Sequence, residues 1–263
     1  MSVIPVSDPA DPRIAGFLDV RERDLVGRQG LFMAEGEVVL RLAAARSDHK
    51  IRAVLLSEGR ARRLDDLVAR LDAPVYVAAQ GVMDAIAGFH IHRGILALVE
   101  PPPPPAPDAL LAGLPARARV VGLCGIANHD NMGGIFRNAA AFGADAVLLD
   151  GACCDPLYRK AIRVSVGASL IVPFARVADE REMVRLLEAT GFEVVALSPS
   201  GATALSAYAP APRTAALFGT EGPGLPADLL AATRTLSIPM AGGFDSLNVA
   251  TTSGIVLHHL TRA

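Results

Sequence analysis

Residues 238–249, Ile238-Pro-Met-Ala-Gly-Gly-Phe-Asp-Ser-Leu-Asn-Val249, are the stretch around which the chain is organised. The pattern predicts the end of a strand, a glycine-containing loop and the first turn of an apolar helix. Ser246 and Asn248 stand at the mouth of that helix. Polar side chains on a loop between two rigid elements are typical of a binding or catalytic site. We therefore expect a functional site here.

Two other stretches share this arrangement, residues 128–137 and 217–226. Each follows a short apolar run that is typical of a buried strand, the first run ending at Cys124 and the second at Phe218. In an open α/β sheet, ligands bind beyond the carboxyl ends of the strands. We therefore expect the three loops to form one composite site.

Strands and helices alternate along the second half of the chain. Apolar runs predict strands at 120–124, 146–149, 170–172, 193–197, 215–218 and 235–238, and apolar spacing predicts helices after the 128–137 loop to 142, and at 155–166 and 179–190. Alternation of this kind, with buried strands, predicts a mostly parallel sheet that helices cover on both faces.

The first 100 residues read as a smaller α/β module. Strands are expected at 31–34, 51–56, 75–77 and 94–99, and helices from 11 to about 25, at 37–45 and at 60–71. Five consecutive prolines, 101–105, then exclude both sheet and helix and favour a semi-rigid spacer. We predict a module at 1–100, a linker at 101–118 and a larger domain at 119–263.

Composition limits the partners. The net charge is −2, so any nucleic acid must be held by a local patch and not by a broadly basic surface. The two lysines are Lys50 and Lys160, and the other basic residues are arginines, whose planar fork suits phosphate. The start of the chain has no signal-peptide pattern and no apolar run approaches the ~18 residues of a membrane span. We expect a cytoplasmic protein without a membrane partner.

The cysteines do not predict a metal site. Cys124, Cys153 and Cys154 lack the spacing of metal ligands, and free thiols in a reducing compartment are the expectation. A nucleotide-phosphate cradle is also disfavoured. Residues 219–224 have neither the dinucleotide-binding spacing nor a P-loop, Glu221 would repel a pyrophosphate, and Pro223 lacks a backbone donor. This loop better suits a neutral or cationic ligand.

The three stretches resemble the three motifs of the SpoU class of knotted methyltransferases, which methylate ribose 2′-hydroxyls of transfer and ribosomal RNA. The first motif is matched by Asn131, Gly133 and Arg137, the second by residues 218–224, and the third by residues 238–249. Residues 163–168, Arg-Val-Ser-Val-Gly-Ala, resemble an intermediate segment of the family. His129-Asp130 and Ala250 depart from the family pattern.

The resemblance implies a trefoil knot and S-adenosylmethionine bound by backbone groups at Gly219, Ile238 and Leu247. It implies that Arg137 activates a ribose hydroxyl, with Glu221 orienting Arg137 or the ribose. By the same resemblance, the hydroxyl and the Arg137 side chain are held by Asn131, Ser246 and Asn248. A homodimer without a metal is expected, acting on rRNA or tRNA, with rRNA slightly favoured.

The first module resembles, less specifically, the RNA-binding domain that precedes the catalytic domain in several of these enzymes. Arg21, Arg23 and Arg28 are the expected RNA contacts, and a solvated charged helix is the alternative. Two other functions stay open: a knotted RNA-binding protein without catalysis, and an RNA base methyltransferase of the same superfamily.

Overall fold

The computed structural model of the chain describes residues 3–18, 30–87, 93–242 and 246–262. Its internal contacts divide the chain into two compact units. The first unit comprises residues 1–103 together with 157–170, and the second comprises 104–156 together with 171–263. The inclusion of 157–170 in the first unit was not anticipated from the sequence.

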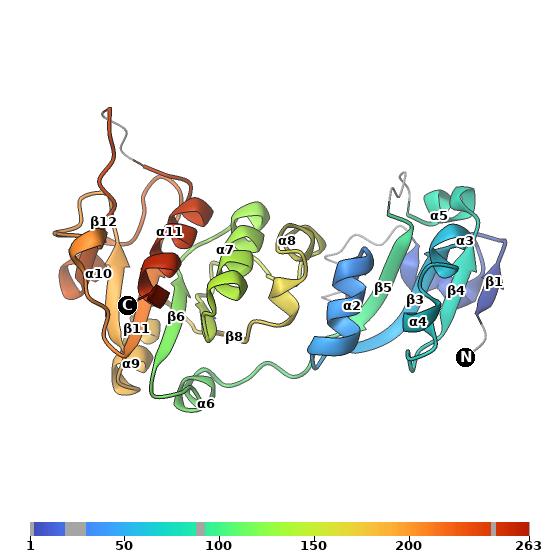
Figure 1. Cartoon of the computed structure of the whole chain (residues 1–263), viewed down its shortest axis with the longest axis horizontal. Helices are drawn as coiled ribbons and strands as arrows, with labels where there is room; N and C mark the ends of the chain where they lie inside the picture. Colours follow the sequence, from blue (N-terminus) through green and yellow to red (C-terminus); the bar gives the residue numbers. More distant parts are fainter. Residues whose placement is uncertain (1–2, 19–29, 88–92, 243–245, 263) are drawn as a thin grey trace. The chain divides into compact units, whose positions relative to one another are not determined.

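The first unit contains a five-stranded mixed sheet in the order β1-β4-β3-β5-β2 (Figure 1). β1, β4 and β3 pair in parallel, and β5 is antiparallel to both β3 and β2. The strands are β1 (Ile4–Val6), β2 (Phe32–Glu35), β3 (Lys50–Ser57), β4 (Val75–Ala78) and β5 (Ile95–Glu100). The helices before the linker are η1 (Pro12–Phe17), α2 (Glu37–Arg46), α3 (Glu58–Ala61), α4 (Asp65–Val68) and α5 (Gln80–Ala87).

The single helix predicted at 60–71 is wrong. The chain instead forms α3 and α4 with a break between them. Leu64 marks the break, with φ −115° and ψ 20°, and its side chain is fully buried. Burial of this leucine in the core outweighs the local preference for one continuous helix.

Residues 157–170 supply a short helix to the first unit, α8 (Arg159–Val164), followed by the turn η2 (Ala168–Leu170). The helix predicted at 155–166 is therefore shorter at both ends. Arg159 donates from Nε and Nη2 to Oε2 of Glu35 on β2, at 3.0 and 2.8 Å. Because Glu35 is buried, this ion pair compensates a carboxylate that would otherwise be costly in the core.

The second unit contains a seven-stranded sheet in the order β10-β12-β9-β11-β6-β7-β8, in which every described pair is parallel. Its strands are β6 (Ala118–Leu123), β7 (Ala146–Leu149), β8 (Phe174–Arg176), β9 (Glu193–Leu197), β10 (Thr203–Ala204), β11 (Arg213–Phe218) and β12 (Arg234–Ser237). Its α-helices are α6 (Pro107–Ala112), α7 (His129–Phe142), α9 (Glu180–Ala189), α10 (Ala227–Ala232) and α11 (Val249–Arg262), with the turn η3 (Leu205–Ala207).

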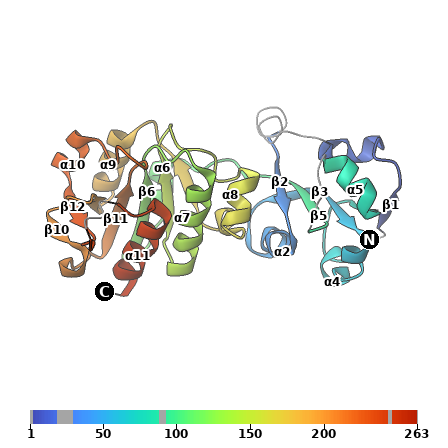
Figure 2. The same cartoon turned by 90° about the horizontal axis from the view of Figure 1, so that it is seen from above.

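Helices cover both faces of this sheet. Figure 2 shows α7 and α11 on one face and α6, α9 and α10 on the other. Alternate strand residues point to opposite faces, so Val120 and Leu217 meet Met183 and Leu187 of α9 in one apolar layer. The predicted fold class is confirmed, and the trefoil knot stays a prediction. Within the described residues, no helix is both long and apolar enough to cross a bilayer.

One predicted strand lies later than expected. Residues 168–170 form the turn η2, and the extended segment is β8, which begins after Pro173. Proline lacks a backbone N–H, so it is tolerated at the start of a strand, where its carbonyl can still accept. The carbonyl of Pro173 accepts from the N–H of Val147 on the neighbouring β7, at 2.9 Å.

A buried arginine ties the last helix to the sheet. Arg119, on β6, is 6 % exposed. Its Nε donates to the carbonyl of Leu260 on α11 at 2.8 Å, and its Nη1 donates to the carbonyls of Ala211 and Pro212 at 3.0 and 2.7 Å. The carbonyls of Pro212 and Ala211 also accept from the N–H of Ala118 and from Thr214 Oγ1, so the guanidinium adds a second donor to each. Leu260 lies in the last turn of α11, where carbonyls lack intrahelical donors, and Arg119 supplies one.

We predict that Arg119→Ala lowers the free energy of unfolding by about 3 kcal/mol, because it removes the charge-assisted hydrogen bonds from a buried guanidinium to the carbonyls of Leu260, Ala211 and Pro212. Urea unfolding followed by circular dichroism measures the change. The matched control is Arg185→Ala, an exposed position on α9, which should change stability by less than about 0.5 kcal/mol. Equal stabilities for the two variants would contradict the role of Arg119.

Candidate functional site

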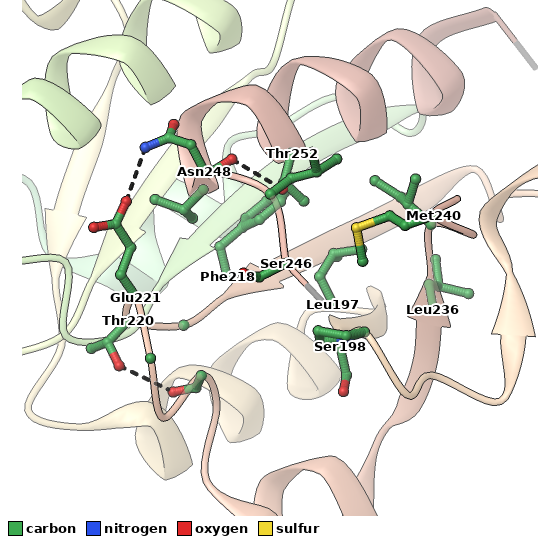
Figure 3. Close-up of a pocket in the computed structure, with 17 residues that line it drawn as sticks. Leu197, Ser198, Phe218, Thr220, Glu221, Leu236, Met240, Ser246, Asn248 and Thr252 are labelled. Atoms are coloured by element: carbon green, nitrogen blue, oxygen red, sulfur yellow. Dashed lines mark hydrogen bonds between the residues drawn. The ribbon is translucent and has the colours of Figure 1, made fainter. Parts of the chain in front are cut away.

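A cavity of about 430 Å³ lies at the carboxyl ends of three adjacent strands, β12, β9 and β11 (Figure 3). This is the edge at which open α/β sheets bind ligands, and the volume suits a small molecule. Two of the three predicted loops, those at 217–226 and 238–249, line the cavity directly. The third contacts it through a hydrogen bond described below.

The lining combines an apolar surface with several polar groups. The apolar side chains are Leu197, Pro199, Phe218, Leu236, Ile238, Met240, Leu247 and Val249. The polar ones are Ser198, Thr220, Glu221, Ser246, Asn248 and Thr252. Gly219, Ile238 and Leu247, the predicted cofactor contacts, all line this cavity, and that role stays a prediction.

The loop after β11 requires glycine at its first position. A Cβ built on Gly219 would lie 2.4 Å from the carbonyl carbon of Gly224 and 2.5 Å from the amide nitrogen of Leu225. Backbone atoms cannot move aside as a flexible side chain can, so any other residue would open the loop. The loop is closed by a hydrogen bond from the N–H of Gly224 to the carbonyl of Thr220, at 3.2 Å.

Three polar side chains from distant parts of the chain form a closed hydrogen-bonded cluster at the cavity. Oε1 of Glu221 accepts from Nδ2 of Asn131 and from Nδ2 of Asn248, both at 2.9 Å. Asn248 Nδ2 also donates to Oδ1 of Asn131, at 2.8 Å. Figure 3 shows Glu221 and Asn248 pointing toward each other at one end of the cavity. We call Asn131, Glu221 and Asn248 the amide–carboxylate cluster.

The cluster lies where two helices begin. Asn248 Oδ1 accepts from the N–H groups of Ala250 and Thr251 in the first turn of α11, at 3.0 and 3.2 Å. Asn131 lies in the first turn of α7, which Asn128 caps through the N–H of Asp130. The Glu221 side chain therefore lies beside two helix N-termini, which carry partial positive charge.

The structure corrects the prediction that 128–137 is a loop. Helix α7 begins at His129, so Asn131 and Arg137 are on the same helix. Six residues separate them, about 240° around the helix axis, and Arg137 is exposed. Arg137 does not line the cavity, and no described residue is hydrogen-bonded or ion-paired to its side chain.

The predicted grouping of site residues is therefore only partly observed. Asn131, Glu221 and Asn248 come together, and Ser246 lines the same cavity. A Glu221–Arg137 contact is not observed, because α7 directs Arg137 away from Asn131, the residue of this helix that is bonded to Glu221. Arg21, Arg23 and Arg28 lie outside the described residues.

Sequence reasoning missed a brace behind the site. Oδ2 of the buried Asp150, directly after β7, accepts from the N–H of Gly125 at 2.9 Å. Its Oδ1 accepts from the N–H of Cys153 at 3.0 Å, and Cys153 Sγ accepts from the N–H of Ile126 at 3.2 Å. These contacts hold the chain between β6 and α7. The sequence did contain one signal for this contact, an aspartate directly after an apolar strand.

The thiols are not candidates for chemistry at neutral pH. Burial raises the pKa of Cys153 to about 12 and that of Cys154 to about 11, so both remain protonated. All three cysteines are free. Within the described part of the chain, no cluster of three His, Cys, Asp or Glu side chains is arranged to hold a metal ion.

Comparison with known proteins agrees with this architecture. Residues 118–258 match the SpoU rRNA Methylase family, and residues 40–105 match a domain described as RNA 2′-O ribose methyltransferase substrate binding. An uncharacterised tRNA/rRNA methyltransferase of Mycobacterium bovis is 39 % identical over 274 residues, covering 100 % of this chain and 93 % of the relative.

Two solved structures are similar over nearly the whole chain. An AdoMet-bound rRNA methyltransferase from Sinorhizobium meliloti has a TM-score of 0.83 at 25 % identity, covering 99 % of this chain and 98 % of that one. An RNA 2′-O ribose methyltransferase has a TM-score of 0.78 at 26 % identity and covers 98 % of both chains. The chain belongs to the SpoU rRNA methylase family.

Proposed function

We propose that this protein transfers a methyl group from S-adenosylmethionine to a ribose 2′-hydroxyl of rRNA or tRNA, with rRNA favoured. The observation that carries the proposal is the amide–carboxylate cluster at the mouth of a cavity at the strand ends. Family membership supports the methyl transfer, and the similar RNA 2′-O ribose methyltransferase supports the ribose as acceptor.

The cavity suits S-adenosylmethionine. Its volume and apolar lining accommodate a nucleoside with an aliphatic chain, and the glycine at 219 exposes backbone groups for hydrogen bonding. The absence of a phosphate cradle in the 219–224 loop agrees with a ligand that carries no phosphate. When bound, this cofactor supplies an electrophilic methyl group on a sulfonium. Gly219, Ile238 and Leu247 are the residues proposed to hold it.

The amide–carboxylate cluster offers an acceptor for the ribose. Only Oε1 of Glu221 is used by the two amides, and no described residue donates to Oε2. A carboxylate oxygen in this position accepts a hydrogen bond from a hydroxyl and fixes its direction. Ser246 and Asn248 line the same cavity and would position the ribose.

Arg137 would act as a cation and not as a base. Its guanidinium stabilises charge that develops on the ribose oxygen or binds an adjacent RNA phosphate. Its exposure on α7 leaves it accessible to RNA or to a second copy of the chain.

We further propose that the protein is a cytoplasmic homodimer. In each copy, residues 1–100 would contact the RNA, residues 101–118 would form a linker, and residues 119–263 would form the catalytic domain. An exposed apolar side chain on the last helix supports the dimer: Ile255, on α11, is 40 % exposed. Burial of such a side chain against a second copy would be favourable.

Incubation with methyl-labelled S-adenosylmethionine and total RNA, followed by digestion to nucleosides, tests the reaction. We expect a labelled 2′-O-methylnucleoside, and we expect Arg137→Ala to lower the initial rate at least a hundredfold while the exposed control Arg185→Ala does not. A labelled base would instead indicate a base methyltransferase. Absence of any incorporation would indicate an RNA-binding protein without catalysis.

Gly219→Ala tests the cofactor site. The added Cβ collides with the backbone at Gly224 and opens the loop, so we expect the affinity for S-adenosylmethionine to fall at least tenfold in a calorimetric titration. Gly59→Ala is the matched control, because a Cβ there meets nothing within 4 Å. An unchanged affinity in Gly219→Ala would place the cofactor elsewhere.

A further inference from the structure

A second cavity, of about 270 Å³, lies within the first unit and is lined by three arginines. Arg60 follows β3 on α3, Arg93 precedes β5, and Arg163 lies on α8. Residues 163–168 resemble a family segment for which the proposed catalytic site leaves no role. The three arginines come from stretches separated by many residues and line one cavity only in the folded unit.

The charge of this cavity is positive. Glu35 and Glu37 also line it, but both are already paired. Glu35 accepts from Arg159 at 2.8 Å, and Glu37 accepts from Arg41 at 3.0 Å. By contrast, no acidic side chain in the described ranges pairs with Arg60, Arg93 or Arg163. Three positive charges gathered without local neutralisation are unfavourable unless an anion binds.

Two residues that line the cavity, Gly36 and Val166, have positive φ angles. Gly36, at φ 98°, lies directly beneath Arg93, and a Cβ there would approach Arg93 Cδ and Nη1 to 3.2 Å. Val166, which lines the cavity two residues after the end of α8, adopts φ 55°. A positive φ is strained for a β-branched residue, and strain of this kind is retained where the surrounding structure requires it.

We propose that Arg60, Arg93 and Arg163 form a binding site for phosphodiester groups of RNA. The planar guanidinium fork matches phosphate oxygens, and an open cavity with several such forks suits a backbone that presents successive phosphates. The net charge of −2 makes such a local patch necessary for RNA binding. This inference rests on the proposed function, because it takes RNA as the substrate.

Salt dependence of RNA binding tests the site. The intact chain and the triple variant R60Q/R93Q/R163Q are titrated with a short fluorescent single-stranded RNA of mixed sequence at several salt concentrations. Each lost phosphate contact reduces the slope of log affinity against log salt by about 0.7. For the triple variant, we expect the slope of log affinity against log salt to be smaller in magnitude by about two. We also expect its affinity for the RNA at low salt to be at least tenfold lower.

A second triple variant separates this site from a general effect of charge. The variant R46Q/R63Q/R185Q changes the net charge equally at three exposed positions that do not line the cavity. Its slope of log affinity against log salt should change by less than half as much as that of the first variant. Equal losses in the two variants, or no loss in the first, would overturn the proposal.

Two further measurements keep the result decisive. Affinity for S-adenosylmethionine is measured on the same preparations, and if the triple variant has lost it, the single variant R93Q is used, with an expected slope loss of about 0.7. If inorganic phosphate binds wild type but not the variant while the RNA slope is unchanged, the site is for free phosphate and the proposal fails. The two proposals can fail separately. If the intact chain methylates no RNA but the triple variant still shows a reduced salt dependence of RNA affinity, the phosphate site is supported and the proposed function is rejected.

Discussion

One oxygen of Glu221 accepts hydrogen bonds from the amides of Asn131 and Asn248, and the site depends on this shared acceptor. The three residues come from the start of α7, the loop after β11 and the start of α11, which are adjacent only in the folded chain. Since Asn248 also caps α11 through its Oδ1, the position of the last helix and the direction of the carboxylate are set by the same side chain. A change in any of the three would displace the other two, because each amide has both its donor and its acceptor engaged.

The contact between α7 and α11 extends this constraint away from the cavity. Asn138 Nδ2 donates to the carbonyl of Ala250 at 2.6 Å and to Ser253 Oγ at 3.0 Å, and these groups lie between the two helices. At the far end of α11, Arg119 holds the carbonyl of Leu260. The last helix is therefore held in its first two turns and in its final turn. Hydrogen bonds at both ends specify one register of the helices, whereas apolar packing alone would tolerate others.

The chemistry proposed for this protein divides between its two compact units. In the second unit, apolar side chains and exposed backbone at the strand ends suit a cofactor, while a carboxylate braced by amides suits a hydroxyl. In the first unit, three arginines that line one cavity are not paired with an acidic side chain of the described residues, and they suit the phosphates of a long substrate. The acidic overall balance of the chain makes this separation useful, because electrostatic attraction is then confined to the surfaces where RNA must be held.

By itself, the sequence determined the parallel sheet, most of its strands and the polar loops at one edge. The alternation of strands with helices along the chain and the glycine-containing turns are local patterns, so they can be read from the sequence. It did not determine that 60–71 breaks at Leu64, because burial in the core outweighed helical spacing. Nor did it show that 128–137 is a helix that directs Arg137 away from Asn131. Tertiary structure alone decided the pairing of Glu221 with two amides, the brace at Asp150 and the grouping of residues 157–170 with the first unit. These features depend on contacts between residues far apart in the chain, whose distances and directions no local pattern records.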